Sequence, residues 1–132
     1  MKEMDYKKLK GIFAGYNEIK AAYLFGSYAE GKQSSDSDLD LGVLLEEGYS
    51  KMIKLDILTK LTQNNFDHVD LVIINNASIL VKYEVIKHNR LIYRSVDFDS
   101  SAFYSKTIRQ YLDFKPYLEV QRMYLKERII NA

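Results

Sequence analysis

The sequence contains no cysteine and a single proline, Pro116. The absence of cysteine excludes disulfide bonds and thiolate-bound metals. No segment approaches the roughly 18 apolar residues of a membrane-spanning helix, and the amino terminus has no apolar run typical of a signal peptide. We therefore expect a cytoplasmic protein that does not associate with a membrane.

Charge of either sign is also not in excess, because 19 basic and 18 acidic side chains give a formal net charge of +1. Direct nucleic-acid binding is therefore not expected. Six basic and three acidic side chains fall in residues 101–132. This mildly basic tail is compatible with a charged partner or with an ordinary solvated helix face. The two histidines form no Ser-His-Asp pattern, which leaves hydrolase chemistry without support.

The length and the apolar content of 47% predict a single domain, residues 1–132, with one modest core. Apolar periodicity predicts an α/β (α+β) fold, a small mixed sheet flanked by helices. A long C-terminal helical segment, about 99–131, should be bent or broken at Pro116. The other expected helices are about 3–17, 50–64 and 78–89, and the expected strands are 20–25, 38–45, 69–74 and, at an edge, 91–93.

Three acidic residues interrupt apolar strands. In the segment 38–45, the two-residue period of a strand places Asp38 and Asp40 on one face and the leucines between them on the other. Asp70 interrupts the run 69–74 and would lie beside this pair if the two strands are neighbours. Clustered carboxylates repel one another unless a cation neutralises them, and Mg²⁺ prefers oxygen ligands. The pattern favours a site for two metal ions of the phosphoryl-transfer kind over the alternative of acids in ordinary turns.

The same acids have the spacing of a calcium-binding EF-hand loop, since Asp36, Asp38 and Asp40 are followed by Glu47. That loop needs glycine at its sixth position, where this chain has Leu41. The apolar run that follows is typical of a strand, so we reject the EF-hand interpretation.

Gly26-Ser27 follows the first predicted strand directly, within a twelve-residue loop, 26–37, which is long for a compact domain. A short helical turn there, capped by Ser27 and closed near Gly31, would present free backbone N–H groups to a phosphate. Alone, a Gly-Ser pair is far more often part of a simple turn, and its value comes from standing just upstream of the acids.

Together these residues resemble a known signature. Gly26-Ser27, ten residues, and then Asp38-Leu39-Asp40 is similar to the motif of the polymerase-beta-like nucleotidyltransferase superfamily. The stretches 26–31 and 37–41 resemble its minimal nucleotidyltransferase (MNT) members, antitoxins commonly encoded beside a HEPN-domain ribonuclease toxin. Residues 69–72 match the third acidic strand of the family, and residues 111–115 resemble the closing helix of the antitoxin branch.

The resemblance implies an enzyme that transfers AMP from ATP to a tyrosine of a HEPN toxin. It implies that Asp38, Asp40 and Asp70 are catalytic and bind Mg²⁺, two ions in all, and that Gly26 and Ser27 bind the nucleotide. It also implies a complex with the toxin, and homo- or hetero-oligomers remain open. Two alternatives are transfer to a small molecule such as an aminoglycoside, and a non-catalytic antitoxin that blocks the toxin sterically.

One residue departs from the pattern of the family, because Glu30 stands where many relatives have arginine. Its negative charge would oppose the binding of a triphosphate.

Two other features have a structural as well as a functional interpretation. Tyrosines recur at 104, 111, 117 and 124, and they would either pack on the sheet or face a partner. His68 shares a strand face with Asp70 if that strand extends so far, and His88 fits a helix end.

Overall fold

The computed structural model describes residues 5–33 and 38–131, with side chains up to residue 126. Four strands form one mixed sheet in the order β3-β2-β1-β4. β2 runs parallel to β3 and antiparallel to β1, which pairs antiparallel with β4 at the edge. The strands are β1 (Ile19–Phe25), β2 (Leu39–Leu45), β3 (Val69–Ile73) and β4 (Arg90–Arg94).

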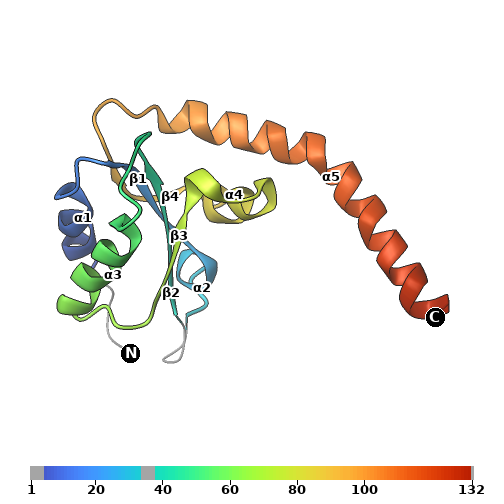
Figure 1. The fold of residues 1–132 in the computed structure, drawn as a ribbon, viewed down its shortest axis with the longest axis horizontal. Helices are drawn as coiled ribbons and strands as arrows, with labels where there is room; N and C mark the ends of the chain where they lie inside the picture. Colours follow the sequence, from blue (N-terminus) through green and yellow to red (C-terminus); the bar gives the residue numbers. More distant parts are fainter. Residues whose placement is uncertain (1–4, 34–37, 132) are drawn as a thin grey trace.

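Helices cover both faces of this sheet, as Figure 1 shows. α1 and α3 lie on one face, whereas α2 and α4 lie on the other and the long α5 passes over α4. The mixed sheet with flanking helices confirms the expected fold class. The helices are α1 (Tyr6–Ala14), α2 (Gly26–Ala29), α3 (Ile53–Gln63), α4 (Ile79–Ile86) and α5 (Ser100–Asn131), with a 3₁₀ turn η1 at Ile74–Asn76.

Alternation along β2 divides the core between the two faces. Leu41 and Val43 are fully buried against α1 and α3. The residues between them face the other layer, where Gly42 lies against Val85 of α4. β1 is central, so its residues 21–24 are buried on both faces. Asp40 therefore points to the α4 side of the sheet because its two neighbours fill the larger core.

Several element ends differ from the predicted ones for local reasons. α1 begins at Tyr6, because the Asp5 carboxylate accepts a hydrogen bond from the backbone N–H of Lys8 (2.9 Å) and caps the helix; the predicted start at residue 3 lies outside the described residues. The third strand ends at Ile73, one residue early. The Asn75 side chain there donates to the carbonyl of Leu45 and accepts from its N–H, both at 2.8 Å, and this turns the chain out of the sheet.

Pro116 does not break α5, which continues from Ser100 to Asn131. The helix changes direction about half-way along its length (Figure 1), so the bent alternative of the prediction is the one observed. The first part packs on the domain, where the ring of Tyr111 stacks on Tyr83 of α4 with centroids 3.7 Å apart. Within the described residues, no helix is long and apolar enough to cross a membrane.

The close approach of β2 and α4 yields a stability prediction. A Cβ atom at Gly42 would overlap Val85 Cγ1 and lie 3.4 Å from Ile74 Cδ1. We expect Gly42→Ala to lower the free energy of unfolding by about 1–3 kcal/mol, measured by urea denaturation. Adding Val85→Ala should remove the overlap and give less loss than the sum of the two single changes.

A matched control is Gly11→Ala in α1, where no atom lies within 4 Å of the added methyl group. It should stabilise the protein by about 0.5–1 kcal/mol because alanine is the better helix former. Equal effects of the two substitutions would contradict the packing described for Gly42.

Candidate active site

The sheet topology brings the three predicted acids to one end of the sheet. Asp40 is the register partner of Asp70 across the parallel β2–β3 pair, and of Phe25 across β1–β2. The predicted strand 38–45 included Asp38, but β2 begins at Leu39, so Asp38 lies immediately before the strand; its side chain is exposed, as is that of Asp70. The expectation that Asp70 lies beside the pair is confirmed.

Asp40 is the most enclosed of the three acids. Burial raises the pKa of its carboxyl group, and repulsion from Asp70 and Asp38 raises it further. The ionised form of Asp40 is therefore destabilised both by its partial removal from water and by two neighbouring negative charges. A bound cation would stabilise the ionised Asp40 and offset the repulsion from its two neighbours. This end of the sheet therefore favours the binding of a cation.

Gly26 directly follows β1 and touches the Asp40 carboxylate. A Cβ atom at Gly26 would overlap Asp40 Oδ2 and lie 3.0 Å from its Cγ. The backbone of Gly26 also has φ of +69°, in the left-handed region that favours glycine. Both facts require glycine here, and they place the start of α2 against the Asp40 carboxylate.

α2 is a single helical turn, as the sequence predicted, but Ser27 does not cap it. The N-cap residue is Phe25, no side chain caps the turn, and Ser27 is its second residue. The turn closes through Glu30 N–H to Gly26 carbonyl (3.2 Å) and Lys32 N–H to Ser27 carbonyl (2.8 Å), just before and just after Gly31. A helix start without a side-chain cap leaves N–H groups for an outside acceptor such as a phosphate oxygen.

The donor set fits Mg²⁺ in its substrate-bound form rather than as a closed protein cage. Among residues 5–33 and 38–131, no three His, Asp or Glu side chains are arranged to hold an ion by themselves. Mg²⁺ commonly takes one or two carboxylates and completes its coordination with water and substrate phosphates. Asp40 with Asp38 or Asp70 meets that smaller requirement.

Two residues near α2 were not identified from the sequence as parts of the site. His88 Nε2 lies 3.3 Å from Glu30 Oε1, so the unexpected Glu30 faces a partner after α4. Arg90 Nη1 donates to the carbonyl of Ala29 (3.4 Å), at the C-terminal end of α2. Arg90 reaches this position because it pairs with Leu24 across β1–β4. No sequence motif predicts that pairing.

His68 does not share the strand face with Asp70, because β3 begins only at Val69. Its side chain is exposed, and its backbone carbonyl accepts from the N–H of Leu39 (2.8 Å). His68 therefore contributes through its main chain, by tying the start of β2 to the start of β3.

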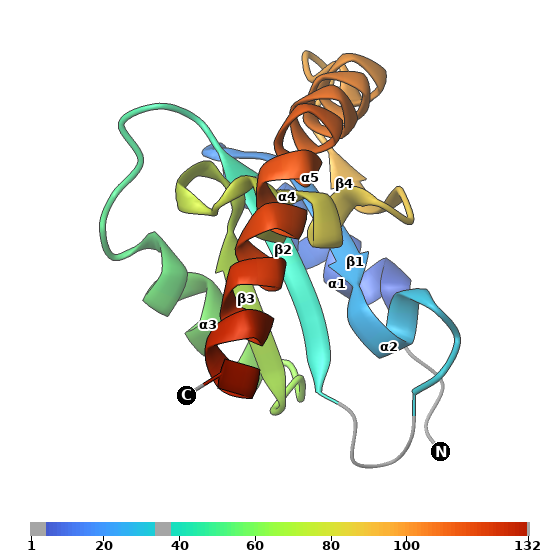
Figure 2. The same cartoon turned by 90° about the vertical axis from the view of Figure 1, so that its right-hand side faces the viewer.

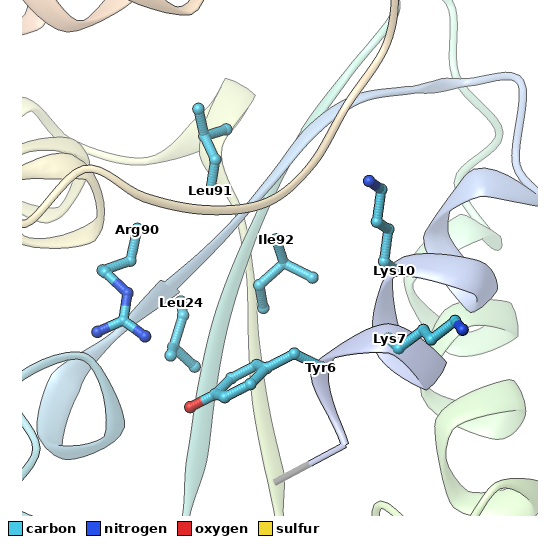
Figure 3. Close-up of a pocket in the computed structure, with 7 residues that line it drawn as sticks. All are labelled: Tyr6, Lys7, Lys10, Leu24, Arg90, Leu91 and Ile92. Atoms are coloured by element: carbon cyan, nitrogen blue, oxygen red, sulfur yellow. The ribbon is translucent and has the colours of Figure 1, made fainter.

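A pocket of about 280 Å³ lies elsewhere, against the sheet face that α1 covers. Figure 3 shows Lys7 and Lys10 entering it from α1 and Arg90 from the opposite side, over a floor that includes Leu24 and Ile92. Asp38, Asp40, Asp70, Gly26 and Ser27 do not line it. The acidic site is thus an open sheet end, separate from this basic pocket.

The contact between Gly26 and Asp40 predicts a larger loss of stability for Gly26→Ala than backbone strain alone would give. Gly48 is a matched control, since its φ is +77° and no atom lies within 4 Å of an added Cβ. Gly48→Ala should cost about 1–2 kcal/mol, and Gly26→Ala a further ~1–3 kcal/mol, in urea denaturation. The double variant with Asp40→Ala should recover most of the excess, whereas equal losses at both glycines would refute the contact.

Comparison with known proteins identifies the family to which this arrangement of strands and acids corresponds. Residues 7–98 match the family model described as polymerase beta, nucleotidyltransferase. The protein adenylyltransferase MntA of Shewanella oneidensis is 30% identical over 107 residues, which cover 81% of this chain and 76% of that protein.

Two solved structures share the fold over nearly the whole chain. A toxin–antitoxin structure with AMP-PNP has a TM-score of 0.74 and 24% identity, covering 96% of this chain and 99% of its own. An MNT antitoxin in complex with a tri-AMPylated Shewanella oneidensis HEPN toxin has a TM-score of 0.67 and 22% identity, covering 95% of each chain. The family match spans the sheet, α2 and all three acids, and so this chain belongs to the polymerase beta nucleotidyltransferase family.

Proposed function

We propose that this protein is an antitoxin that transfers AMP from ATP to a tyrosine of a cognate HEPN ribonuclease toxin. The observation that carries the proposal is the pairing of Asp40 with Asp70, next to Gly26, in a member of this family. The adenylyltransferase MntA as a relative, and the fold shared with an antitoxin bound to an AMPylated toxin, support this acceptor.

In this mechanism the protein positions the triphosphate and the acceptor at one end of the sheet. The N–H groups at the start of α2 and the Ser27 hydroxyl donate to phosphate oxygens. Asp38, Asp40 and Asp70 are the residues that would hold Mg²⁺, up to two ions, and the metal would supply positive charge against the triphosphate and the leaving group. The Arg90 contact with Ala29 holds the far end of α2 in place.

The transfer step exchanges one phosphorus–oxygen bond for another. The tyrosine oxygen attacks the α-phosphorus of ATP and forms the new bond, while the bond from that phosphorus to the oxygen bridging to the β-phosphate breaks. Pyrophosphate leaves with the electron pair of the broken bond. The tyrosine proton passes to Asp70, whose exposed carboxylate is open to the acceptor.

Glu30 does not prevent this reaction, in our proposal, because it lies at the C-terminal end of α2, where its carboxylate faces His88. A cytoplasmic location is part of the same proposal, since the toxin and ATP are both found there.

A labelling experiment tests the proposed transfer. The protein is incubated with α-labelled ATP, Mg²⁺ and the product of the reading frame adjacent to its gene, the proposed HEPN toxin, and label on that partner is measured. Asp40→Asn should reduce the rate by at least about 100-fold, because it removes a charge that serves the metal and the phosphates. Asp97→Asn changes an exposed carboxylate outside the site and should leave the rate unchanged.

The alternatives give distinct outcomes in that experiment. If Asp40→Asn neutralises the toxin as well as the unaltered protein does, without label, the protein acts by binding alone. If label appears on a small hydroxyl compound such as an aminoglycoside but not on the toxin, the proposed acceptor is wrong.

The charge balance at Asp40 gives a second, independent prediction. In metal-free buffer Asp40→Asn should raise the midpoint of thermal unfolding by about 1–3 °C, because it removes a half-buried charge that two carboxylates repel. Mg²⁺ with AMP-PNP should raise the midpoint of the unaltered protein by roughly 3–6 °C and that of Asp40→Asn by much less. Equal stabilisation of both proteins by Mg²⁺ with AMP-PNP would exclude Asp40 from the metal site.

A further inference from the structure

The distal part of α5, residues 112–126, presents an unusual amount of apolar surface to solvent. Seven large apolar side chains in this segment are between 38% and 67% exposed. Single exposed apolar residues are ordinary, but a contiguous set on one helix marks an interaction surface. The seven are Leu112, Phe114, Tyr117, Val120, Met123, Tyr124 and Leu125.

These side chains occupy about two thirds of the helix circumference. At 3.6 residues per turn, Leu112, Val120 and Tyr124 lie on one side, and Phe114 and Leu125 extend the face by which the first part of α5 packs on the domain. Lys115, Glu119, Arg122 and Lys126 form a polar edge, while Asp113 and Gln121 lie between the apolar side chains, and residues 112–126 carry a net charge of +1. A partner that covers these apolar side chains would stabilise the distal part of α5, since an isolated helix is only marginally stable in water.

The distal part of α5 stands on the same side of the sheet as the acids. Figure 1 shows it leaving α4 and running clear of the sheet, and Figure 2 shows it passing in front of β2 and β3 toward their site end. Asp40 points to this side of the sheet, because Leu39 and Leu41 fill the core on the other. A molecule seated on the sheet-facing side of α5 would thus be held in front of Asp40 and Asp70.

α5 also lies outside the catalytic family domain. The family match ends at residue 98, two residues before α5 begins. The two toxin–antitoxin structures nevertheless cover 95–96% of this chain, a share that must include most of the 32 residues of α5. The helix is therefore an addition to the catalytic domain that this chain shares with structures containing a toxin.

We propose that the distal part of α5 is the docking element for the protein acceptor, and that it holds the acceptor tyrosine at the Asp40/Asp70 end of the sheet. The complementary surface on the toxin is an apolar groove between helices with an acidic rim that meets Lys115, Arg122 and Lys126. This inference rests on the proposed function for the identity of the partner. It adds the surface that selects that partner, because the catalytic acids by themselves discriminate no protein from another.

The test is a double substitution among the seven exposed apolar residues of the distal part of α5, called the stripe below. Tyr117→Ser with Tyr124→Ser should weaken toxin binding by at least about 30-fold in isothermal titration, since exposed tyrosines are frequent interface hot spots. Transfer measured with α-labelled ATP should show KM for the toxin raised by a similar factor with little change in kcat. The matched control is Met52→Ser with Leu55→Ser, equally exposed apolar residues at α3 on the opposite side of the sheet, expected within about threefold of the unaltered protein.

Both double variants are first required to keep the circular dichroism spectrum and the thermal shift with Mg²⁺ and AMP-PNP, so that a lost fold or a lost nucleotide site is recognised. Charge reversal by Lys115→Glu with Arg122→Glu should also weaken binding, by about 10-fold, through the acidic rim. Equal weakening by the α3 control, or an unchanged KM for the stripe variant, would overturn the proposal. Self-association of the chain that the stripe variant abolishes, with toxin binding intact, would assign the stripe to a second copy.

The two proposals can fail separately. If the toxin binds through α5 but receives no label, the docking surface stands and the transfer reaction is wrong. If the toxin receives label with the same KM in the stripe variant, transfer stands and the docking surface is wrong.

Discussion

The parallel pairing of β2 with β3 in a single register is the constraint on which the site depends. It places Asp40 opposite Asp70, and the core fixes it, because Leu39 and Leu41 on either side of Asp40 are buried against α1 and α3. A slip of one residue would move Asp40 into that core and the leucines to solvent, which is prohibitively costly. The hydrophobic core of one layer thus sets the geometry of acids on the other face.

The same arrangement carries an energetic cost at its functional end. Three carboxylates and a left-handed glycine in contact with one of them are poor choices for stability alone. The structure offsets this cost nearby: the His68 carbonyl joins the start of β3 to β2, and Arg90 and His88 hold the end of α2 from the β4 side. Local strain and like charge in a site, with support from its neighbours, are typical of a surface built to bind a charged ligand.

α5 combines two roles along one continuous helix. Its proximal part is an element of the domain, where Tyr111 stacks on Tyr83 and Thr107 is almost fully buried. Its distal part also carries large apolar side chains, which stay exposed among the described residues. The recurring tyrosines therefore belong to both of the alternatives that the sequence left open: Tyr104 and Tyr111 pack on the domain, whereas Tyr117 and Tyr124 are exposed.

The sequence by itself determined the four strands and the single turn after Gly26, whereas Asp38 lies before β2 and so outside the strand in which it was predicted to share a face with Asp40. The strands and the turn follow from the two-residue and 3.6-residue spacing of apolar side chains in strands and helices, and from the backbone freedom of glycine. Both depend on only a few neighbouring positions. The tertiary structure decided everything that depends on distant segments: the Asp40–Asp70 register, the partner of Glu30, the role of Arg90 and the point at which α5 leaves the domain. Ser27 shows the limit most clearly, since the capping role inferred from its residue type fails once Phe25 and the Asp40 contact fix where α2 begins. Pairing between strands and packing between layers are set by the whole core at once, and no local pattern in the sequence contains them.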